Sequence, residues 1–503
     1  MKNQLTRRDF IRLCGISSIG LALAACGVAP TPTPAPTNTS APTNAPLPTA
    51  IPTLTNTPVP TSTATATATP TATATATKTF EQWAQTNMPD TKLLTSVETQ
   101  YAKALGIDAK TIETSIVILK GVNGSFAAVI DKATGYPLLV SELREGEYIW
   151  NEVSQARLSY ELGKPVGVSR TGAFLRPNSQ KGKSPELLKI RGQYGWVTTP
   201  DPNWTNPVDN SAYAMVQIDA NGNIKYDFRL ADYVVNEAIQ RGQQVNGFGL
   251  FWGKDVPDAI LKKGFTSKSD LFSFVDEILT NVVGHFKGKI SMYSLINEYF
   301  GDAHQGGGDF WKVTANKLGI SDIDFLSYLY DKAKAIDKNA EFIFNDYAFE
   351  IPGTKSYNSK RAVETYDLVS QLAAKGKIDG IGAQTHLYSA DFQTPQQVEQ
   401  HIQDFTKTIQ KYRALGIRVY CTELNVRGGH NNAQDETYRR IMRDILPLVD
   451  GIIIWGINDD DTSYPNELAT PYTAQNQPTS AFYSMNKGIL DAIEKQTGIK
   501  LIK

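Results

Sequence analysis

The chain alternates short apolar runs with segments of helical periodicity from about residue 156 onward, and this rhythm restricts the fold more than any other feature. Segments such as SDLFSFVDEILTNVVGHF and DIDFLSYLYDKAKAID carry apolar residues at helical spacing. The eight apolar runs read KPVGVS, YGWVTT, QVNGFGLFWG, ISMYSLINE, AEFIFNDY, DGIGAQTH, RVYCTELNV and GIIIWGIND. Eight strands, each followed by a helix or a long loop, predict the α/β class and a (β/α)8 TIM barrel over residues 156–503. A doubly wound sheet is the alternative, and it is less favoured because no glycine-rich phosphate loop follows the first strand.

Two segments of different composition precede the predicted barrel. Residues 80–155 hold a helical stretch and short strands with turns at Asn123-Gly124 and Thr134-Gly135, which predicts a small α+β N-terminal subdomain of unassigned role. Residues 27–79 consist largely of Pro, Thr and Ala. This composition offers too little apolar surface to offset chain entropy, so we expect a disordered linker.

Residues 1–26 have the layout of an export signal, with a basic start, a short apolar stretch and small residues before Cys26. Arg7 and Arg8 resemble a twin-arginine motif, and Leu23-Ala24-Ala25-Cys26 resembles the lipobox of bacterial lipoproteins. The resemblance implies an exported bacterial protein with lipid on Cys26, anchored at the cell surface or membrane by that lipid alone. Only Cys421 would then remain of the three cysteines, which leaves no disulfide framework.

The overall charge balance argues against one class of partner. The formal net charge is -1 and the isoelectric point is about 6.6. Nucleic-acid binding favours a basic face, so we expect no nucleic-acid partner. We expect a monomer.

Polar residues gather at the ends of five predicted strands. They are Asn297-Glu298, Asn345-Asp346, Gln384 with His386, Glu423 with Asn425, and Asn458-Asp459. One such residue alone is usually a solvated or capping residue, but active sites of these barrels lie at the C-terminal strand ends, and five alike predict a site. Residues two apart on a strand share a face, so Gln384 and His386 should point together, with Cys421 as a small filler beneath Glu423.

Two glutamates from different strands suggest a specific chemistry. Glu298 ends the fourth strand and Glu423 lies on the seventh, so a closed barrel brings both to one pocket. Two carboxyl groups facing each other across a sugar are the minimum for glycoside hydrolysis. A separation of roughly 5–5.5 Å gives a retaining enzyme and roughly 6.5–9.5 Å an inverting one. The sequence leaves this distance open.

Five blocks of the sequence together resemble glycoside hydrolase family 10, the retaining endo-β-1,4-xylanase family. The blocks are SLINEYFGD, FIFNDY, KIDGIGAQTHL, VYCTELNV and IIIWGINDDD. They stand in the family's order and cover most of strands four to eight. The resemblance implies a glycosidase that cleaves β-1,4-linked xylan or a related plant-type polysaccharide by double displacement, with an endo mode of attack and no metal or organic cofactor.

The resemblance also implies roles for individual residues. Glu298 corresponds to the general acid/base and Glu423 to the nucleophile. The substrate-binding residues that it implies are Asn297 for the sugar 2-hydroxyl, Gln384, His386 to orient the nucleophile, and Trp455 as a platform. Trp252 is also kept, although core packing is the more common role for such a residue, and Tyr464 lies near the place of a second family tryptophan.

The sequence departs from the family mainly in strands two and three. Phe248 and Gly253 stand where the family has histidines, and the second of these histidines normally reaches the sugar beside the scissile bond. The family's Asn-Glu-x-x-Lys-Trp segment has no counterpart, because TTPDPNWTNP lies in its place without the lysine.

Two other functions remain as alternatives. A non-catalytic carbohydrate-binding surface lipoprotein on a degenerate barrel would explain the lost sugar-gripping residues, but it would not need the whole retained motif set. A metal-dependent hydrolase is the more distant alternative, with Asp459-Asp460-Asp461 as a calcium site; such acidic triplets in loops are usually solvated.

Overall fold

The computed structural model describes residues 79–144, 147–169, 194, 196–198, 215–219, 223–247, 249–301, 309–460, 462, 464 and 466–498. The predicted export signal with Cys26 and nearly all of the predicted linker lie outside these residues, as does Phe248. In the described part of the chain, no helix is long and apolar enough to cross a membrane.

Parallel strands form a closed ring in the second part of the chain. The strands are β5 (Val166–Val168), β6 (Trp196–Thr198), β9 (Gln244–Gly247), β10 (Phe251–Trp252), β11 (Met292–Asn297), β12 (Glu341–Asp346), β13 (Gly380–Ala383), β14 (His386–Tyr388), β15 (Arg418–Arg427) and β16 (Gly451–Ile454). Hydrogen bonds run from β10 through β11, β12, β13, β15, β16, β5 and β6 to β9, and β9 also pairs with β11.

This second pairing of β11 closes the ring. Counted around the barrel, β9 and β10 together form the third strand, and β13 and β14 together form the sixth. All eight predicted strands are present. The (β/α)8 TIM barrel is therefore confirmed, and the open doubly wound sheet is wrong.

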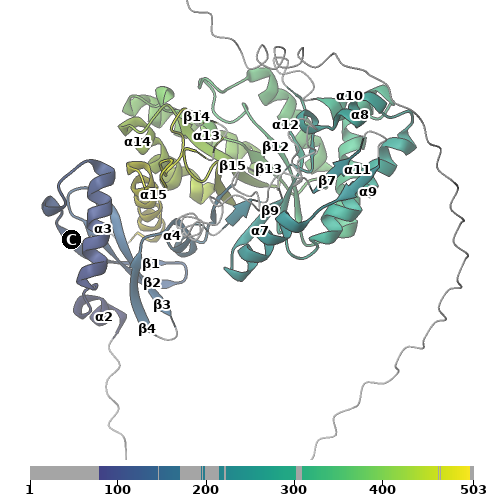
Figure 1. Cartoon of the computed structure of the whole chain (residues 1–503). Coiled ribbons are helices and arrows are strands. Elements are labelled where there is room, and N and C mark those ends of the chain that lie inside the picture. Colours follow the sequence, from purple (N-terminus) through teal and green to yellow (C-terminus); the bar gives the residue numbers. More distant parts are fainter. Residues whose placement is uncertain are drawn as a thin grey trace, which may run out of the picture. The chain divides into compact units, whose positions relative to one another are not determined.

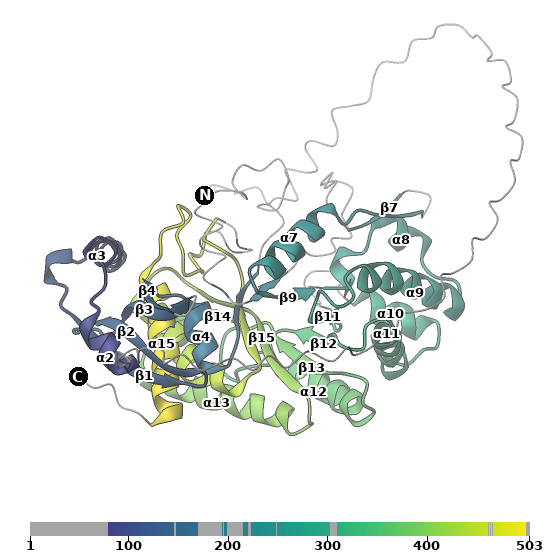
Figure 2. The same ribbon diagram turned by 90° about the horizontal axis from the view of Figure 1, so that it is seen from below.

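Helices lie outside the strands in both views of the molecule (Figures 1 and 2). They are α7 (Arg229–Gln240), α8 (Asp258–Lys263), α9 (Lys268–His285), α10 (Phe310–Lys317), α11 (Asp322–Ile336), α12 (Ser359–Ala374), α13 (Pro395–Arg413), α14 (Asn432–Arg440) and α15 (Ser480–Thr497). Short turns also occur: the 3-10 turns η4 (Gly253–Asp255), η5 (Ser389–Asp391) and η7 (Leu446–Leu448) and the π-helical turn η6 (Ile441–Ile445).

Helix α9 illustrates why these segments fold as they do. The Ser267 side chain caps its first turn by accepting a hydrogen bond from the backbone of Asp270. Leu271, Val275 and Ile278 recur at helical spacing and are buried. Each such side chain contributes about 1.5–3 kcal/mol through burial.

An antiparallel sheet with its own helices precedes the barrel. Its strands follow one another in the order β1 (Thr114–Gly121), β2 (Gly124–Asp131), β3 (Pro137–Arg144) and β4 (Glu147–Glu152). The flanking helices and turn are α2 (Phe80–Thr86), α3 (Thr91–Leu105), η1 (Ala109–Thr111) and α4 (Gln155–Leu162). A separate small hairpin pairs β7 (Val216–Ile218) with β8 (Ile224–Tyr226).

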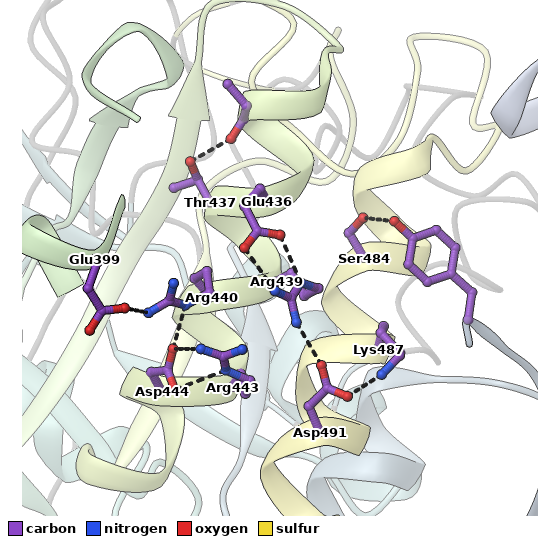
Figure 3. A network of polar contacts seen from close by, with 12 residues as sticks. Glu399, Glu436, Thr437, Arg439, Arg440, Arg443, Asp444, Ser484, Lys487 and Asp491 are labelled. Carbon is purple, nitrogen blue, oxygen red and sulfur yellow. Dashed lines mark hydrogen bonds and ion pairs between the residues drawn. The ribbon is translucent and has the colours of Figure 1, made fainter. Parts of the chain in front are cut away.

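The last helix of the barrel also packs against this N-terminal sheet. The hydroxyl groups of Tyr136 and Ser484, which are 348 positions apart in the sequence, form a hydrogen bond of 2.8 Å. The ring centres of Tyr101 and Tyr483 lie 4.9 Å apart. On its other side, α15 is tied to α14 by Arg439, which donates to Asp491 at 2.9 Å (Figure 3). Most buried apolar residues of the sheet and of the barrel belong to one hydrophobic core, and Met292, Ile343, Tyr420 and Ile453 of the barrel strands form a second, smaller cluster.

Candidate active site

Glu298 follows directly after β11, where the backbone leaves the extended conformation. Its φ is 51°, in the left-handed region that non-glycine residues seldom adopt. The backbone N–H of Glu298 donates to the carbonyl of Asn345 at 2.9 Å, so the ladder to β12 holds this turn in place. The residue as a whole is 7% exposed and lies at the C-terminal end of the barrel strands, where sites of this fold are built.

Both carboxylate oxygens of Glu298 accept hydrogen bonds. Gln384 donates from Nε2 to Oε1 at 3.1 Å. Lys254, from the turn η4, donates from Nζ to Oε2 at 2.6 Å. Glu298 is therefore held between an amide and an ammonium group.

Glu423 lies within β15 and is 3% exposed. Asn345 donates from Nδ2 to Oε1 at 2.8 Å, and Nε2 of His386 lies 3.3 Å from Oε2. Burial raises the pKa of Glu423, and the nearby charge of Glu298 raises it further. The hydrogen bond and charge of His386 and the bond from Asn345 lower that pKa and offset part of the rise.

The side-chain amide of Asn345 links the two halves of the site. Its Nδ2 also donates to Oδ1 of Asn297 at 2.8 Å, and its own Oδ1 accepts from Thr422 Oγ1 at 2.5 Å. Gly382 makes room for this amide, because a Cβ at that position would lie 2.3 Å from Asn345 Oδ1 and 2.7 Å from Cγ2 of Thr422. One asparagine thereby connects the nucleophile candidate to the Asn-Glu pair.

Gln384 and His386 reach the two glutamates by a different route from the one the sequence predicts. Thr385 has a φ of 62°, which ends β13 and restarts the strand as β14. The backbone is therefore not extended between the two residues, contrary to the parity argument. The left-handed turn still brings Gln384 to Glu298 and His386 to Glu423, and its N–H donates to Glu350 at 2.9 Å. Cys421 is fully buried, but the prediction that it lies beneath Glu423 is wrong: it packs in the main core, while its neighbour Tyr420 clusters with Met292, Ile343 and Ile453. A register shift between Cys421 and Leu424 breaks the alternation on which that prediction depended.

Three aromatic residues that the sequence predicts for substrate binding lie near His386 or Asn297. The ring centres of Trp455 and Tyr464 lie 6.4 and 5.6 Å from that of His386. The guanidinium of Arg427 stands 3.8 Å from the centre of the Tyr464 ring. Trp252 is half-buried on β10, in register with Asn297 of β11.

A buried ion pair supports the loop after Glu298. Arg361 of α12 donates to Asp346 at 2.6 Å with one amine, and its other amine donates to the carbonyl of Gly301. Asp346 is wholly buried. Burial raises its pKa to about 7, and the charge of Arg361 and the N–H of Tyr347 offset only part of that effect.

Asp459 of the acidic triplet has protein partners rather than a metal-type cluster. Its Oδ2 lies 2.7 Å from Nε2 of His430, and its Oδ1 accepts from the N–H and hydroxyl of Thr470. Asp461 lies outside the described residues. Within the described ranges, no three His, Cys, Asp or Glu side chains gather as a metal site would require.

The fold and this site define a class of protein: a (β/α)8 barrel with two buried glutamates and amide donors at its C-terminal strand ends. The sequence model of glycosyl hydrolase family 10 matches residues 202–487, and the chain belongs to this family.

Curated relatives of the chain carry xylanase names. Endo-1,4-beta-xylanase B of Thermotoga neapolitana is 27% identical over 245 residues, which are 47% of this chain and 65% of the relative. Beta-1,4-xylanase of Dictyoglomus thermophilum is 28% identical over 256 residues, which are 47% of this chain and 66% of the relative. The chain thus spans less than two thirds of the length of these relatives.

Solved structures agree with the fold. Native xylanase 10B of Thermotoga maritima superposes with a TM-score of 0.55 at 21% identity, covering 68% of this chain and 100% of that one. Xylanase 10B of Thermotoga petrophila, solved with xylobiose, gives the same TM-score at 20% identity and covers 68% of this chain and 99% of that one.

Proposed function

We propose that this protein is a retaining, endo-acting glycoside hydrolase that cleaves β-1,4-linked xylan or a related polysaccharide. The observation that carries the proposal is the pair Glu298 and Glu423, buried at the strand ends and each held by its own donors. Family membership and the xylanase names of the relatives support the reaction class and the substrate class.

The first step needs one ionised and one protonated glutamate. Glu423 attacks the anomeric carbon as a carboxylate, and the hydrogen bonds from Asn345 and His386 orient it. Glu298, carrying a proton, delivers it to the leaving oxygen as the glycosidic bond breaks. The product of this step is a glycosyl ester on Glu423.

The second step reverses the role of Glu298. Its carboxylate removes a proton from water, the water oxygen bonds to the anomeric carbon, and the ester electrons return to Glu423. The sugar leaves with its original configuration because two inversions have occurred at the same carbon.

Asn297 supplies a donor suited to a sugar hydroxyl in this site. Its Oδ1 accepts from Asn345 at 2.8 Å and from Gln384 at 3.4 Å. Its buried Nδ2 has no partner among the described residues. A buried donor without a partner is costly, so a hydroxyl of the bound sugar would satisfy it. The half-buried ring of Trp455 would provide the apolar platform beneath that sugar.

The test is reducing-sugar release from xylan, arabinoxylan, mixed-linkage glucan and cellulose, with Glu423→Gln and Glu298→Gln as matched controls. We expect release of oligosaccharides from a xylan-type polymer and loss of release in both variants. Retention of the anomeric configuration, followed by NMR during early turnover, tests the two-step mechanism. Glycan binding by the folded protein with no release from any polymer would favour the carbohydrate-binding alternative instead.

We also propose that the protein is exported and held at the cell surface or membrane by lipid on Cys26. The twin-arginine-like Arg7-Arg8 pair and the lipobox-like Leu23-Ala24-Ala25-Cys26 support this. Labelling with a radioactive fatty acid in a bacterial host should mark the wild-type chain and not Cys26→Ser. Equal labelling of both chains, or of neither, would contradict the anchor.

A further inference from the structure

The wall of the site next to Glu298 holds a lysine that neither step above uses. Lys254 follows β10 within the turn η4, and its Nζ lies 2.6 Å from Glu298 Oε2. The side chains of the two residues are 20% and 9% exposed, respectively. A pair this sheltered from solvent is screened less than an ordinary surface ion pair.

Two aromatic rings, one on β10 and one directly after β12, hold the ammonium group in place. Its Nζ lies 5.5 Å from the ring centre of Trp252 and 5.7 Å from that of Tyr347. Both distances are within the range in which a cation is attracted to an aromatic face. Lys254 is therefore fixed by three contacts, two to rings and one to the carboxylate of Glu298.

The barrel itself brings this lysine to the acid/base candidate. Trp252 on β10 is in register with Asn297 on β11, so the residues that follow each strand end lie beside one another. Gly253, between Trp252 and Lys254, has no side chain to fill this space. The family histidine is absent at this position, and the next residue in the chain supplies a positive charge.

We propose that Lys254 is a positioning residue for the second step, in which its ammonium group orients the Glu298 carboxylate that removes a proton from water. This inference rests on the proposed function. The hydrogen bond from the ammonium to Oε2 fixes the direction of the carboxylate, and a carboxylate is the form of Glu298 that step two uses. In step one Glu298 must carry a proton, and the contact with Lys254 gives no help there.

The two steps should therefore respond differently when the charge is removed. With a 2,4-dinitrophenyl β-xylobioside, the leaving group departs without a proton, so breakdown of the glycosyl enzyme limits turnover. With a phenyl β-xylobioside, the leaving group needs the proton, so formation of that intermediate limits turnover. Comparing the two substrates separates a role in step two from a general loss of structure.

The experiment compares the full-length protein with Lys254→Met and Lys254→Arg on both substrates. We expect Lys254→Met to lower kcat on the dinitrophenyl substrate roughly 10- to 100-fold, at or below the usual contribution of general base catalysis. KM should fall with it and a burst of dinitrophenolate should appear, since the intermediate accumulates. Azide, a nucleophile that needs no base, should restore turnover, and Lys254→Arg should retain most of it.

The matched control is Lys377→Met, which removes a surface lysine paired with Asp331 at 2.7 Å. We expect no change from it on either substrate. Equal losses on both substrates without azide rescue, or an unchanged kcat on the dinitrophenyl substrate, would overturn the role of Lys254. If Lys254→Met does not fold, Lys254→Gln is read by the same criteria. A wild-type protein that is silent on both substrates would overturn the proposed function first, and this inference with it.

Discussion

The two glutamates of the site each accept a hydrogen bond from a neutral amide but differ in their second partner. The amides are Asn345 for Glu423 and Gln384 for Glu298. The second partner is the imidazole of His386 for Glu423 and the ammonium of Lys254 for Glu298. The neighbours of Glu423 come from strands whose motifs match the family. Lys254 directly follows the third barrel strand, where the sequence departs from the family. The blocks that resemble the family thus supply the hydrogen-bond partners of both glutamates except Lys254.

The largest effect should come from removing the glutamates themselves, and it should differ between them. Glu423→Gln should lower kcat about 10⁴-fold or more on every substrate, because no glycosyl enzyme forms without the nucleophile. Glu298→Gln should suppress polymer hydrolysis comparably but still form the intermediate from a dinitrophenyl glycoside, seen as a burst. A burst from Glu423→Gln would show that the two roles are assigned the wrong way round.

Displacing the Asn345 side chain should weaken the hydrogen bonding that orients Glu423. Gly382→Ala would place a Cβ 2.3 Å from Asn345 Oδ1 and displace the amide that orients Glu423. We expect kcat to fall about 10²–10³-fold, as it does when one preorganised donor is lost. The control is Gly284→Ala, where the added carbon meets only Ile336 at 3.9 Å. Equal activities of the two alanine variants would contradict the bridging role.

Removing His386 should change the pH dependence of kcat/KM through its effect on Glu423. The hydrogen bond and charge of His386 lower the pKa of Glu423 against the larger effect of burial, so that pKa should rise further in His386→Ala. Activity requires the ionised glutamate, and the acid limb of kcat/KM should therefore move to higher pH, with about a 10-fold loss at acidic pH. The profile of His401→Ala, outside the site, should stay in place. A shift of the acid limb to lower pH in His386→Ala would refute this coupling.

The smallest effect on rate should come from Asp346, where stability is the better readout. Its pKa is about 7 in the fold against 3.8 for a free aspartate, so the folded state binds more protons between those values. The contribution of Asp346 is thus complete below pH 3.8 and is lost as pH rises through about 7. Asp346→Asn should remove this slope from the free energy of unfolding, measured by urea titration across that range.

The stability advantage of the wild type over Asp346→Asn should therefore be largest at low pH and shrink as the pH rises through about 7. Asp331→Asn is the control, since that carboxylate is 53% exposed. It should leave both the slope and the stability unchanged. Parallel pH profiles for wild type and Asp346→Asn would refute the assignment.

Much of the fold and half of the site follow from local sequence patterns. The eight strands were predictable because each is a compact apolar run, and the carboxyl ends of barrel strands converge whatever their loops contain. Glu298 and Glu423 stand out because each interrupts or ends such a run. The placement of both in one pocket needs only the strand order.

What the sequence does not reveal depends on contacts between distant strands. Lys254 looks like a solvated loop residue, and only the register of β10 with β11 brings it to Glu298. The two hydrogen bonds that the Asn345 side chain donates reach partners 48 and 78 positions away. Thr385 adopts its left-handed turn without the glycine or asparagine that usually signals one.

The docking of α15 on the N-terminal sheet joins segments that are made at very different times during synthesis. The ring of strands closes only when β16 pairs with β5, for example Ile452 with Val166. The hydrogen bond between Tyr136 and Ser484 can form only after that, because Ser484 is made later. Contacts of such large sequence separation form slowly, so the apolar strands of the sheet stay open to association until α15 has been made. A chain cut before α15 would leave this sheet uncovered, so its protection depends on a helix whose Ser484 lies 348 positions after Tyr136.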